Sequence, residues 1–543
     1  MYIEPNTTIK LYSGIPFDNT YEHTLWFDDI VAQNTYFHGG THAGRAKYTL
    51  ANNSYQRVEK GKMRIALCAD DIYDCNYLAF QNSNYGNKWF YAFIISVEYV
   101  NNVTSEVVFE IDSIQTYLFD MTLEECFVER EHSETDEIGD NILPEPIDCG
   151  DNVCGDTFKT GWFDKYCVIV NISRSSDGQG GYIHGGLIGG LAQGMSPICF
   201  KIDGNNDTET EQNVQTFLHY LDTVVVANSK DEIVSICMFP WNYAVLSTDK
   251  RPKHTAIQQF SINKKIGNYT PKNKKLLTYP YNYLDVDCGN NHALYRYEWF
   301  DDCEHIDFDS VGVVSANPQI ALIPKNYNGN SFASGNYTEK LIMDDFPQVG
   351  YSVDSFKQWI AEHASSTALQ GIGGVGAVTG AVMTTIGAVS AGAKASTVGA
   401  AIFAGVAGSL GVANASNSAM LARNLPNQER GTNSGNVDCA DRQKNFYFRR
   451  MQVTEQQAKV LDDYFSMFGY ACNRVKVPNR TVRLHWNYVK TNGCNIIGSA
   501  PADEIRKVAK IYDRGITFWK SPLGIGQYHN LDGTLIDNPP AVG

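Results

Sequence analysis

Two acidic stretches carry oxygen ligands at spacings that could hold a metal ion or transfer a proton. Residues 203–209 read DGNNDTE, with oxygen side chains at alternate positions as in a calcium-binding loop. This stretch lacks the glycine at the sixth position and a late glutamate, so we favour a solvated turn. Residues 301–307 read DDCEHID and offer carboxylates beside a histidine. No partner stands elsewhere at a defined spacing, so we interpret this stretch as a charged loop.

Two further stretches resemble the phosphate-handling sites of enzymes. The glycines between Gly178 and Gly194 suggest a phosphate cradle, but no GKS or GKT follows them, so we favour a turn or a loop lining a tube. Residues 529–535 read HNLDGTL, close to the DxDGT loop of haloacid-dehalogenase phosphatases. The nucleophilic aspartate would fall on Asn530, whose amide cannot attack phosphorus. GxSxG and HExxH are absent. We predict no enzyme, no catalytic residue, no metal site and no cofactor.

The elements that surround these stretches are mostly strands. Residues 85–99 and 107–117 are aromatic and β-branched, and the polar turn at 101–105 joins them into a predicted hairpin. Trp89, Phe90 and Tyr91 are expected in the core or at a subunit interface, with sugar contact by an exposed tyrosine as the alternative. Residues 127–155 are acidic and are expected to form a loop. Solvated charges are expected at Glu124, Glu125, Glu129 and Glu131, with a charge network between subunits near Arg130 as the alternative.

The second half of the chain alternates short strands with a few helices. Residues 166–200 and 214–345 carry strand-like runs between glycine, proline and asparagine clusters. Residues 452–470 have helical spacing, with Val460, Tyr464 and Phe468 four apart on one face and Gly469 as the stop signal. A short helix is expected at 502–511. The predicted class is α+β and rich in strands. We divide the chain into regions 1–125, 126–213, 214–350, 351–438 and 439–543.

Composition limits the functions this chain can have. The formal net charge of −16 argues against a protein that reads nucleic acid sequence, since such proteins are usually basic. The same charge suits a wall past which nucleic acid slides without sticking. Thirteen cysteines without a CxxC pair indicate free thiols made in a reducing cytosol. The N-terminal residues lack the basic and apolar regions of a signal peptide.

Residues 364–422 differ from the rest of the chain because Lys394 is their single charged residue. Each arm beside Lys394 has the roughly 20 residues that a helix needs to cross a bilayer. The strong hydrophobes of the first arm offer only ~3 kcal/mol at roughly 0.3–0.6 kcal/mol each. One copy therefore inserts marginally, whereas small residues four apart, such as Gly376 and Gly380, let several helices pack closely.

We predict a conditional membrane-active hairpin with Lys394 at its tip, where the lysine avoids the cost of the bilayer centre. A flexible loop or a core helix of small residues is the alternative. The predicted membrane-active residues are Leu369, Ile372, Val375, Val378, Val382, Ile386, Val389, Lys394, Val398, Ile402, Phe403, Val406 and Leu410.

Three blocks of sequence together resemble one family. The first comprises residues 11–27 (LYSGIPFDNTYEHTLWF). The second comprises residues 76–94, 109–120 and 127–145. The third comprises YFSMFGY at 464–470, NYVKT at 487–491 and GITFW at 515–519. Their order, with the glycine-rich apolar insert between the second and third blocks, resembles the tail knob, or distal tail tube, protein of small short-tailed phages of the Picovirinae type.

The resemblance implies properties that composition does not show. Such proteins form a hexameric tube of β-barrel-like domains at the virion's tail tip. Hydrophobic loops plug the tube, enter the host cell membrane at infection and open a channel for genome ejection. The implied partners are other copies of the chain, other phage tail proteins, the host membrane, and viral DNA that passes through the lumen without sequence-specific binding. The alternative is a receptor-binding or cell-wall-degrading tail-tip protein without pore activity.

Overall fold

The structure is a computed structural model that divides into two compact units, each built from separate stretches of the chain. It describes residues 6–39, 46–53, 61–160, 166–172, 175–176, 182–183, 196–202, 211–212, 215–216, 233–244, 254–256, 260–313, 317–329, 339–349, 351–353, 428–430, 444–528 and 538–541. Unit 1 comprises Met1–Gly150, Tyr269–Leu276 and Glu455–Gly543, and unit 2 comprises Asp151–Asn268 and Leu277–Thr454. The chain therefore passes between the units four times. The division into five regions stays a prediction.

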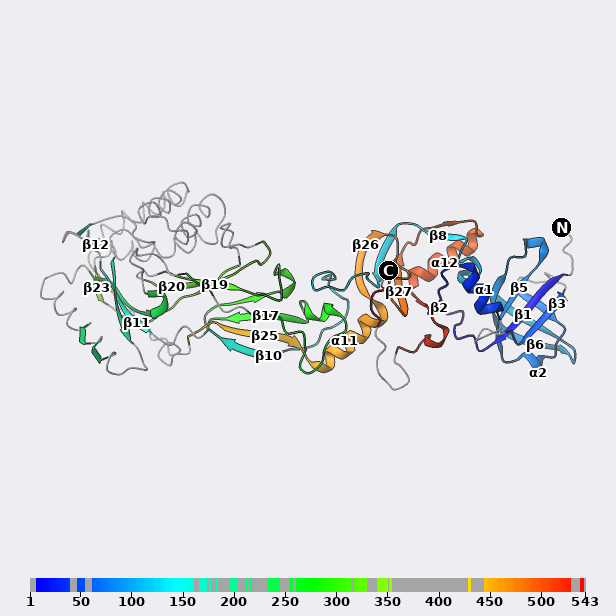
Figure 1. Cartoon of the computed structure of the whole chain (residues 1–543), viewed down its shortest axis with the longest axis horizontal. Coiled ribbons are helices and arrows are strands. Elements are labelled where there is room, and N and C mark those ends of the chain that lie inside the picture. The colour runs from blue at the N-terminus through cyan, green and yellow to red at the C-terminus, as the bar shows by residue number, and fades with distance from the viewer. Residues whose placement is uncertain are drawn as a thin grey trace. The chain divides into compact units, whose positions relative to one another are not determined.

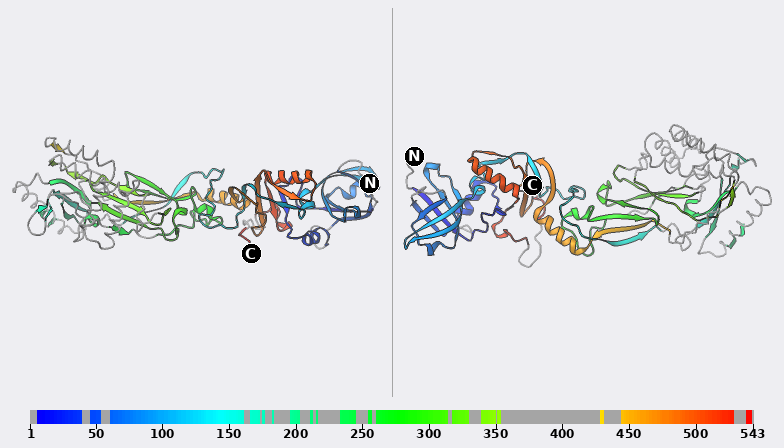
Figure 2. Two further views of the ribbon diagram at one scale, coloured as in Figure 1. Left: turned by 90° about the horizontal axis from the view of Figure 1, so that it is seen from above. Right: turned by 180° about the vertical axis from the view of Figure 1, so that it is seen from behind.

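The first sheet of unit 1 is antiparallel and has six strands in the order β3-β1-β5-β6-β7-β4. Figure 2 shows its blue strands curling around one another. Their bounds, in this order, are Tyr48–Asn53, Thr7–Ser13, Cys75–Gln81, Phe90–Asn101, Thr104–Ile111 and Lys62–Ile65. The short helices α1 (Ile30–His38), α2 (Ala69–Ile72) and η1 (Ser83–Tyr85) lie in the same part of the chain.

The predicted hairpin is confirmed as β6 and β7. Its second strand ends earlier than expected because α3 (Ser113–Tyr117) follows it. The Asp112 carboxylate accepts hydrogen bonds from the backbone N–H groups of Ile114 and Gln115, and so starts this helix. Tyr91 is buried at 2 % exposure, whereas Trp89 and Phe90 are partly buried, so the expected place of this aromatic run in the core is confirmed.

The second sheet of unit 1 has five strands in the order β2-β29-β27-β9-β26. Their bounds, in this order, are His23–Leu25, Ile516–Trp519, Trp486–Asn492, Cys126–Glu131 and Tyr470–Lys476. The β2–β29 pair is parallel and the others are antiparallel. β8 (Met121–Leu123) pairs with β28 (Ile496–Gly498), and η5 spans Pro522–Gly524. The expected loop at 127–155 is wrong at both ends, because β9 occupies its start and β10 (Asn152–Lys159) its end.

Two longer helices complete unit 1. The short helix expected at 502–511 is confirmed as α12 (Ala502–Arg514). The expected helix at 452–470 is confirmed as α11 (Glu455–Phe468). Val460 is 55 % exposed, and the buried residues are Ala458, Leu461, Asp462, Phe465 and Ser466. Apolar spacing does not indicate this buried face, because Asp462 and Ser466 on it are polar. Both are buried together with a hydrogen-bonding partner, Asn273.

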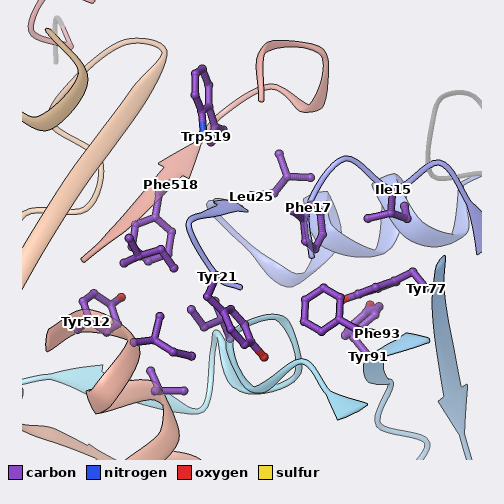
Figure 3. Close-up of a cluster of buried hydrophobic side chains, with 14 of the residues drawn as sticks. Ile15, Phe17, Tyr21, Leu25, Tyr77, Tyr91, Phe93, Tyr512, Phe518 and Trp519 are labelled. Atoms are coloured by element: carbon purple, nitrogen blue, oxygen red, sulfur yellow. The ribbon is translucent and has the colours of Figure 1, made fainter. Parts of the chain in front are cut away.

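One aromatic core joins the two sheets and α12 in unit 1. Figure 3 shows Tyr77, Tyr91 and Phe93 of the six-stranded sheet on one side, and Tyr512, Phe518 and Trp519 from α12 and β29 on the other. Residues 15–25 run between them and contribute the buried Ile15, Phe17, Tyr21 and Leu25. Phe93 meets the Phe17 and Tyr21 rings edge-on, at centroid distances of 6.2 and 5.4 Å. The N-terminal and C-terminal blocks of the sequence therefore share one core.

The described residues of unit 2 form three four-stranded sheets, whose strands are cyan and green in Figure 1 except for the orange β25. The first orders β10, β25 (Tyr447–Val453), β17 (Asn282–Asp287) and β18 (His292–Tyr295). The second orders β14 (Ser196–Ile202), β11 (Tyr166–Ile172), β15 (Ile233–Pro240) and β22 (Gln348–Val349). The third orders β16 (His254–Ala256), β19 (Phe308–Val313), β20 (Gln319–Pro324) and β21 (Leu341–Met343).

Smaller elements of unit 2 are the pair β12 (Ser175–Ser176) and β13 (Tyr182–Ile183), the helices α5 (Trp241–Ala244) and η4 (Tyr297–Trp299), and the pair β23 (Tyr351–Val353) and β24 (Gln428–Arg430). The turn η3 (Lys274–Leu277) ends at the border of the two units. The strands expected within 166–200 and 214–345 are confirmed, as is the strand-rich class.

Candidate functional site

The two ends of the apolar insert are paired with each other. β23 and β24 form an antiparallel ladder in which Tyr351 opposes Arg430 and Val353 opposes Gln428. Neighbouring strands in such a ladder lie about 5 Å apart. Residues 353 and 428, which flank the stretch that contains the predicted apolar insert, therefore lie side by side.

The strand before this ladder is tied into a sheet of unit 2. β22 pairs with β15, with Val349 opposite Ile236 and Gln348 opposite Cys237. The backbone N–H of Met238 also donates to the carbonyl of Pro347 at 2.8 Å. Ile236 and Cys237 are buried, so the attachment point belongs to a packed part of unit 2.

The predicted membrane-active residues, from Leu369 to Leu410, lie outside the described residues, and their role stays a prediction. In the part of the chain that the structure describes, no helix is both long and apolar enough to cross a membrane. The possible calcium loop at 203–209 and the HNLDGTL stretch at 529–535 also fall outside that part, as does the glycine-rich loop apart from β13.

The acidic cluster at 301–307 is a surface loop with local charge pairs. His305 Nδ1 lies 2.6 Å from Asp302 Oδ2, and Lys264 Nζ lies 2.5 Å from Glu304 Oε1. Hydrogen bonding to Asp302 raises the pKa of His305, and the same contact lowers the pKa of Asp302. The described residues include no group of three potential ligands arranged around a metal ion. The charged-loop interpretation agrees with this geometry.

A buried charge cluster in unit 1 was not expected from the sequence. The Glu145 carboxylate, fully buried, forms ion pairs with Arg130 and Lys275, and it accepts the Ala471 backbone N–H at 3.0 Å. The prediction of a solvated Glu131 is wrong: this residue is 4 % exposed, and its carboxylate lies 2.5 Å from Lys476 Nζ. Each carboxylate tolerates burial because a cation and further hydrogen-bond donors compensate its lost hydration.

This cluster has no signal in the local sequence, since its members lie far apart along the chain. Arg130 pairs with Glu145 of the same chain, and the alternative of a charge network between subunits stays a prediction. Glu125 is exposed as expected, and Glu129 is half-buried with its carboxylate 2.7 Å from Lys490 Nζ. These ion pairs connect β9 with β26, β27 and Glu145.

Comparison with known proteins identifies the family. Residues 247–530, more than half of the chain, match the family model of the C-terminal domain of tail knob protein gp9 from Bacillus phage phi29. Residues 5–122 match the N-terminus of the caudoviral major tail protein. The tail knob protein gp9 of Bacillus phage B103 is 26 % identical over 595 residues, covering 95 % of this chain and 97 % of the relative. That of phage phi29 is 26 % identical over 604 residues, covering 96 % and 98 %.

A solved structure agrees with this placement at the level of fold. The tail knob protein gp12 of bacteriophage C1 superposes with a TM-score of 0.55 at 14 % identity, covering 96 % of this chain and 98 % of that one. The resemblance read from the three sequence blocks is therefore confirmed. This chain belongs to the tail knob protein family of short-tailed bacteriophages and is a component of the virion tail.

Proposed function

We propose that this tail knob protein forms the distal end of the tail tube as a homo-hexamer and opens the host membrane to the genome. In the virion, the apolar inserts of the six copies close the lumen. At infection they leave the lumen, enter the membrane and line a channel through which DNA passes. We propose the tail-tip position, the hexamer and the DNA passage from the resemblance to the family, and the apolar insert as the means of membrane entry.

The observation that carries this proposal is the apolar insert with paired ends. Residues 364–422 contain a single charge, and the β23–β24 ladder joins the two ends of the segment that contains them. We infer that a segment whose two ends meet at one short ladder can change its surroundings while the sheets of unit 2 keep their arrangement. This separation between scaffold and insert is what a releasable membrane-active loop needs.

Energetics favour action by several copies. The first arm gains only ~3 kcal/mol in a bilayer, and its serines, threonines and glycines reduce that gain. Six copies add their gains, and their small residues let neighbouring helices pack closely. The net charge of −16 suits a lumen through which DNA passes without sticking to the protein wall.

Dye release from lipid vesicles tests the proposal. The full-length oligomer should release dye across low and neutral pH, and deletion of residues 371–411 should abolish release. The deletion leaves β23 and β24 intact, so the oligomer should still form, as electron microscopy of rings would show. Absence of release from the full-length protein at every pH, or unchanged release after the deletion, would refute the proposed channel.

A charge reversal probes the tip of the insert. Lys394→Glu should weaken binding to anionic vesicles and leave assembly unchanged. Lys459→Glu is a matched control, because Lys459 is exposed and pairs with Glu455 on the surface of α11. Equal lipid binding by the two variants would contradict a tip position for Lys394. Release of reducing sugar or peptide from cell-wall polymer would instead support the enzymatic alternative.

A further inference from the structure

Unit 1 contains a cavity that the proposed channel does not use. Its volume is about 650 Å³, and it lies between the second half of α11, strands β9, β26 and β27, and residues 144–146. Pockets that bind small molecules typically measure about 300–1,000 Å³. All of its lining residues belong to the same unit, so its shape does not depend on how the two units are placed.

One side of the cavity is aromatic. Tyr464 and Phe468 stand one turn apart on α11, with ring centroids 5.2 Å apart, and the Tyr488 ring of β27 meets Phe468 edge-on at 5.2 Å. Phe127 of β9 adds a fourth ring and is 38 % exposed. None of these rings is fully buried, so each retains surface that a ligand can cover.

The charged groups of the lining are already matched to one another. Lys490 Nζ lies 2.7 Å from Glu129 Oε2, with both side chains partly exposed. The Arg130 guanidinium lies 4.7 Å from the centroid of the Tyr464 ring and forms an ion pair with Glu145. A charged ligand has to compete with these pairs, whereas a neutral ligand that accepts and donates hydrogen bonds does not.

We propose that this cavity binds a neutral saccharide. A pyranose ring presents a face of C–H groups, which packs on aromatic rings, and an edge of hydroxyl groups. The hydroxyls find carboxylate, ammonium and amide partners at Glu129, Lys490 and Asn473 around the same cavity. The aromatic rings that can stack on a sugar and the polar groups that can bind its hydroxyls thus line the same cavity. Saccharide binding at this cavity is independent of the apolar insert and goes beyond the proposed channel.

Saturation-transfer-difference NMR on the full-length protein tests the proposal. The probes are four neutral disaccharides, maltose, cellobiose, lactose and N,N′-diacetylchitobiose, and one anionic disaccharide, digalacturonate. At least one neutral disaccharide should bind with a millimolar or tighter Kd and more tightly than digalacturonate. Tyr464→Ala and Lys490→Ala should each weaken that binding at least about fivefold, the loss expected from one ring or one hydrogen-bonding group.

The matched control is Lys459→Ala, which removes a lysine from a surface ion pair of 2.8 Å on the same helix that supplies Tyr464. It should bind like the unaltered protein. Lys490→Ala changes a partly exposed side chain, so it keeps the test decisive if Tyr464→Ala does not fold. No binding of any neutral probe, tighter binding of digalacturonate, or undiminished binding by the folded cavity variants would overturn the proposal. None of these outcomes depends on dye release.

Discussion

Asp462 fixes the short stretch of chain at 269–276 to unit 1, and its removal should loosen that stretch specifically. Its carboxylate is fully buried and accepts four hydrogen bonds. Oδ2 accepts from the Tyr269 hydroxyl at 2.6 Å and the Lys272 backbone N–H at 2.7 Å. Oδ1 accepts from the Asn273 backbone N–H at 2.9 Å and its side-chain amide at 2.6 Å. One side chain of α11 therefore holds a segment nearly two hundred residues away.

The magnitude follows from the number of buried donors that lose this acceptor. Asp462→Asn places an amide NH₂ where one carboxylate oxygen was, so one backbone N–H faces another donor. At about 1–3 kcal/mol for each buried donor left without its acceptor, this variant should lose about 1–3 kcal/mol. Asp462→Ala removes the acceptor of both backbone N–H groups and should lose about 2–6 kcal/mol.

Urea denaturation gives the total loss, and amide hydrogen exchange locates it. Peptides covering 269–276 should exchange faster in both variants, while β11 and β15 of unit 2 should keep their protection. Asp503→Asn is the control, because it makes the same chemical change at an exposed position of α12 and should cost less than about 1 kcal/mol. If Asp462→Asn were as stable as the control and 269–276 stayed protected, the assigned anchoring role would be refuted.

Three further perturbations have defined outcomes. Burial and the charge of Arg483 lower the pKa of His132 to about 3. As pH falls below 6.5 the unfolded chain binds this proton before the folded chain does, so the folded state loses stability. Urea denaturation should show a loss of about 2–3 kcal/mol at pH 4.5, and His132→Gln should reduce that loss. Burial raises the pKa of Asp112 to about 6, so the charged carboxylate opposes folding at pH 7. This unfavourable contribution disappears as pH falls from 6 towards 3.8. Asp112→Asn should therefore raise the thermal midpoint at pH 7 and leave it unchanged at pH 4. Gly312→Ala would place a methyl group 2.6 Å from the Tyr243 Cβ atom, and calorimetry should show a loss of about 1–3 kcal/mol in unit 2.

Sequence patterns predicted the elements that have one solvated face. The β6–β7 hairpin is visible because apolar and polar residues alternate along it, and α12 because its apolar positions recur at helical spacing. The order of the three sequence blocks around the insert was enough to identify the family. Those signals are local, and each depends only on residues within one element or on their succession along the chain.

The missed features depend on partners that are distant in sequence. β9 contains the buried Arg130 and Glu131, whose charges break its apolar pattern, and their partners Glu145 and Lys476 lie elsewhere in the chain. On α11, the buried face contains the Asp462 carboxylate and Ser466, and it differs from the face of Val460, Tyr464 and Phe468 that the apolar spacing picks out. Periodicity assumes that buried residues are apolar, and both elements violate that assumption.

The discontinuous construction of unit 1 has a consequence for synthesis on the ribosome. β2 takes Phe518 opposite Thr24, and β9 lies between β27 and β26, so the N-terminal residues find these strand partners only after the final part of the chain has emerged. Unit 2 is complete once Thr454 is translated. A premature stop codon shortly after Thr454 would therefore leave β2 and β9 unpaired at the start of the protein, and it should be as damaging as an early deletion.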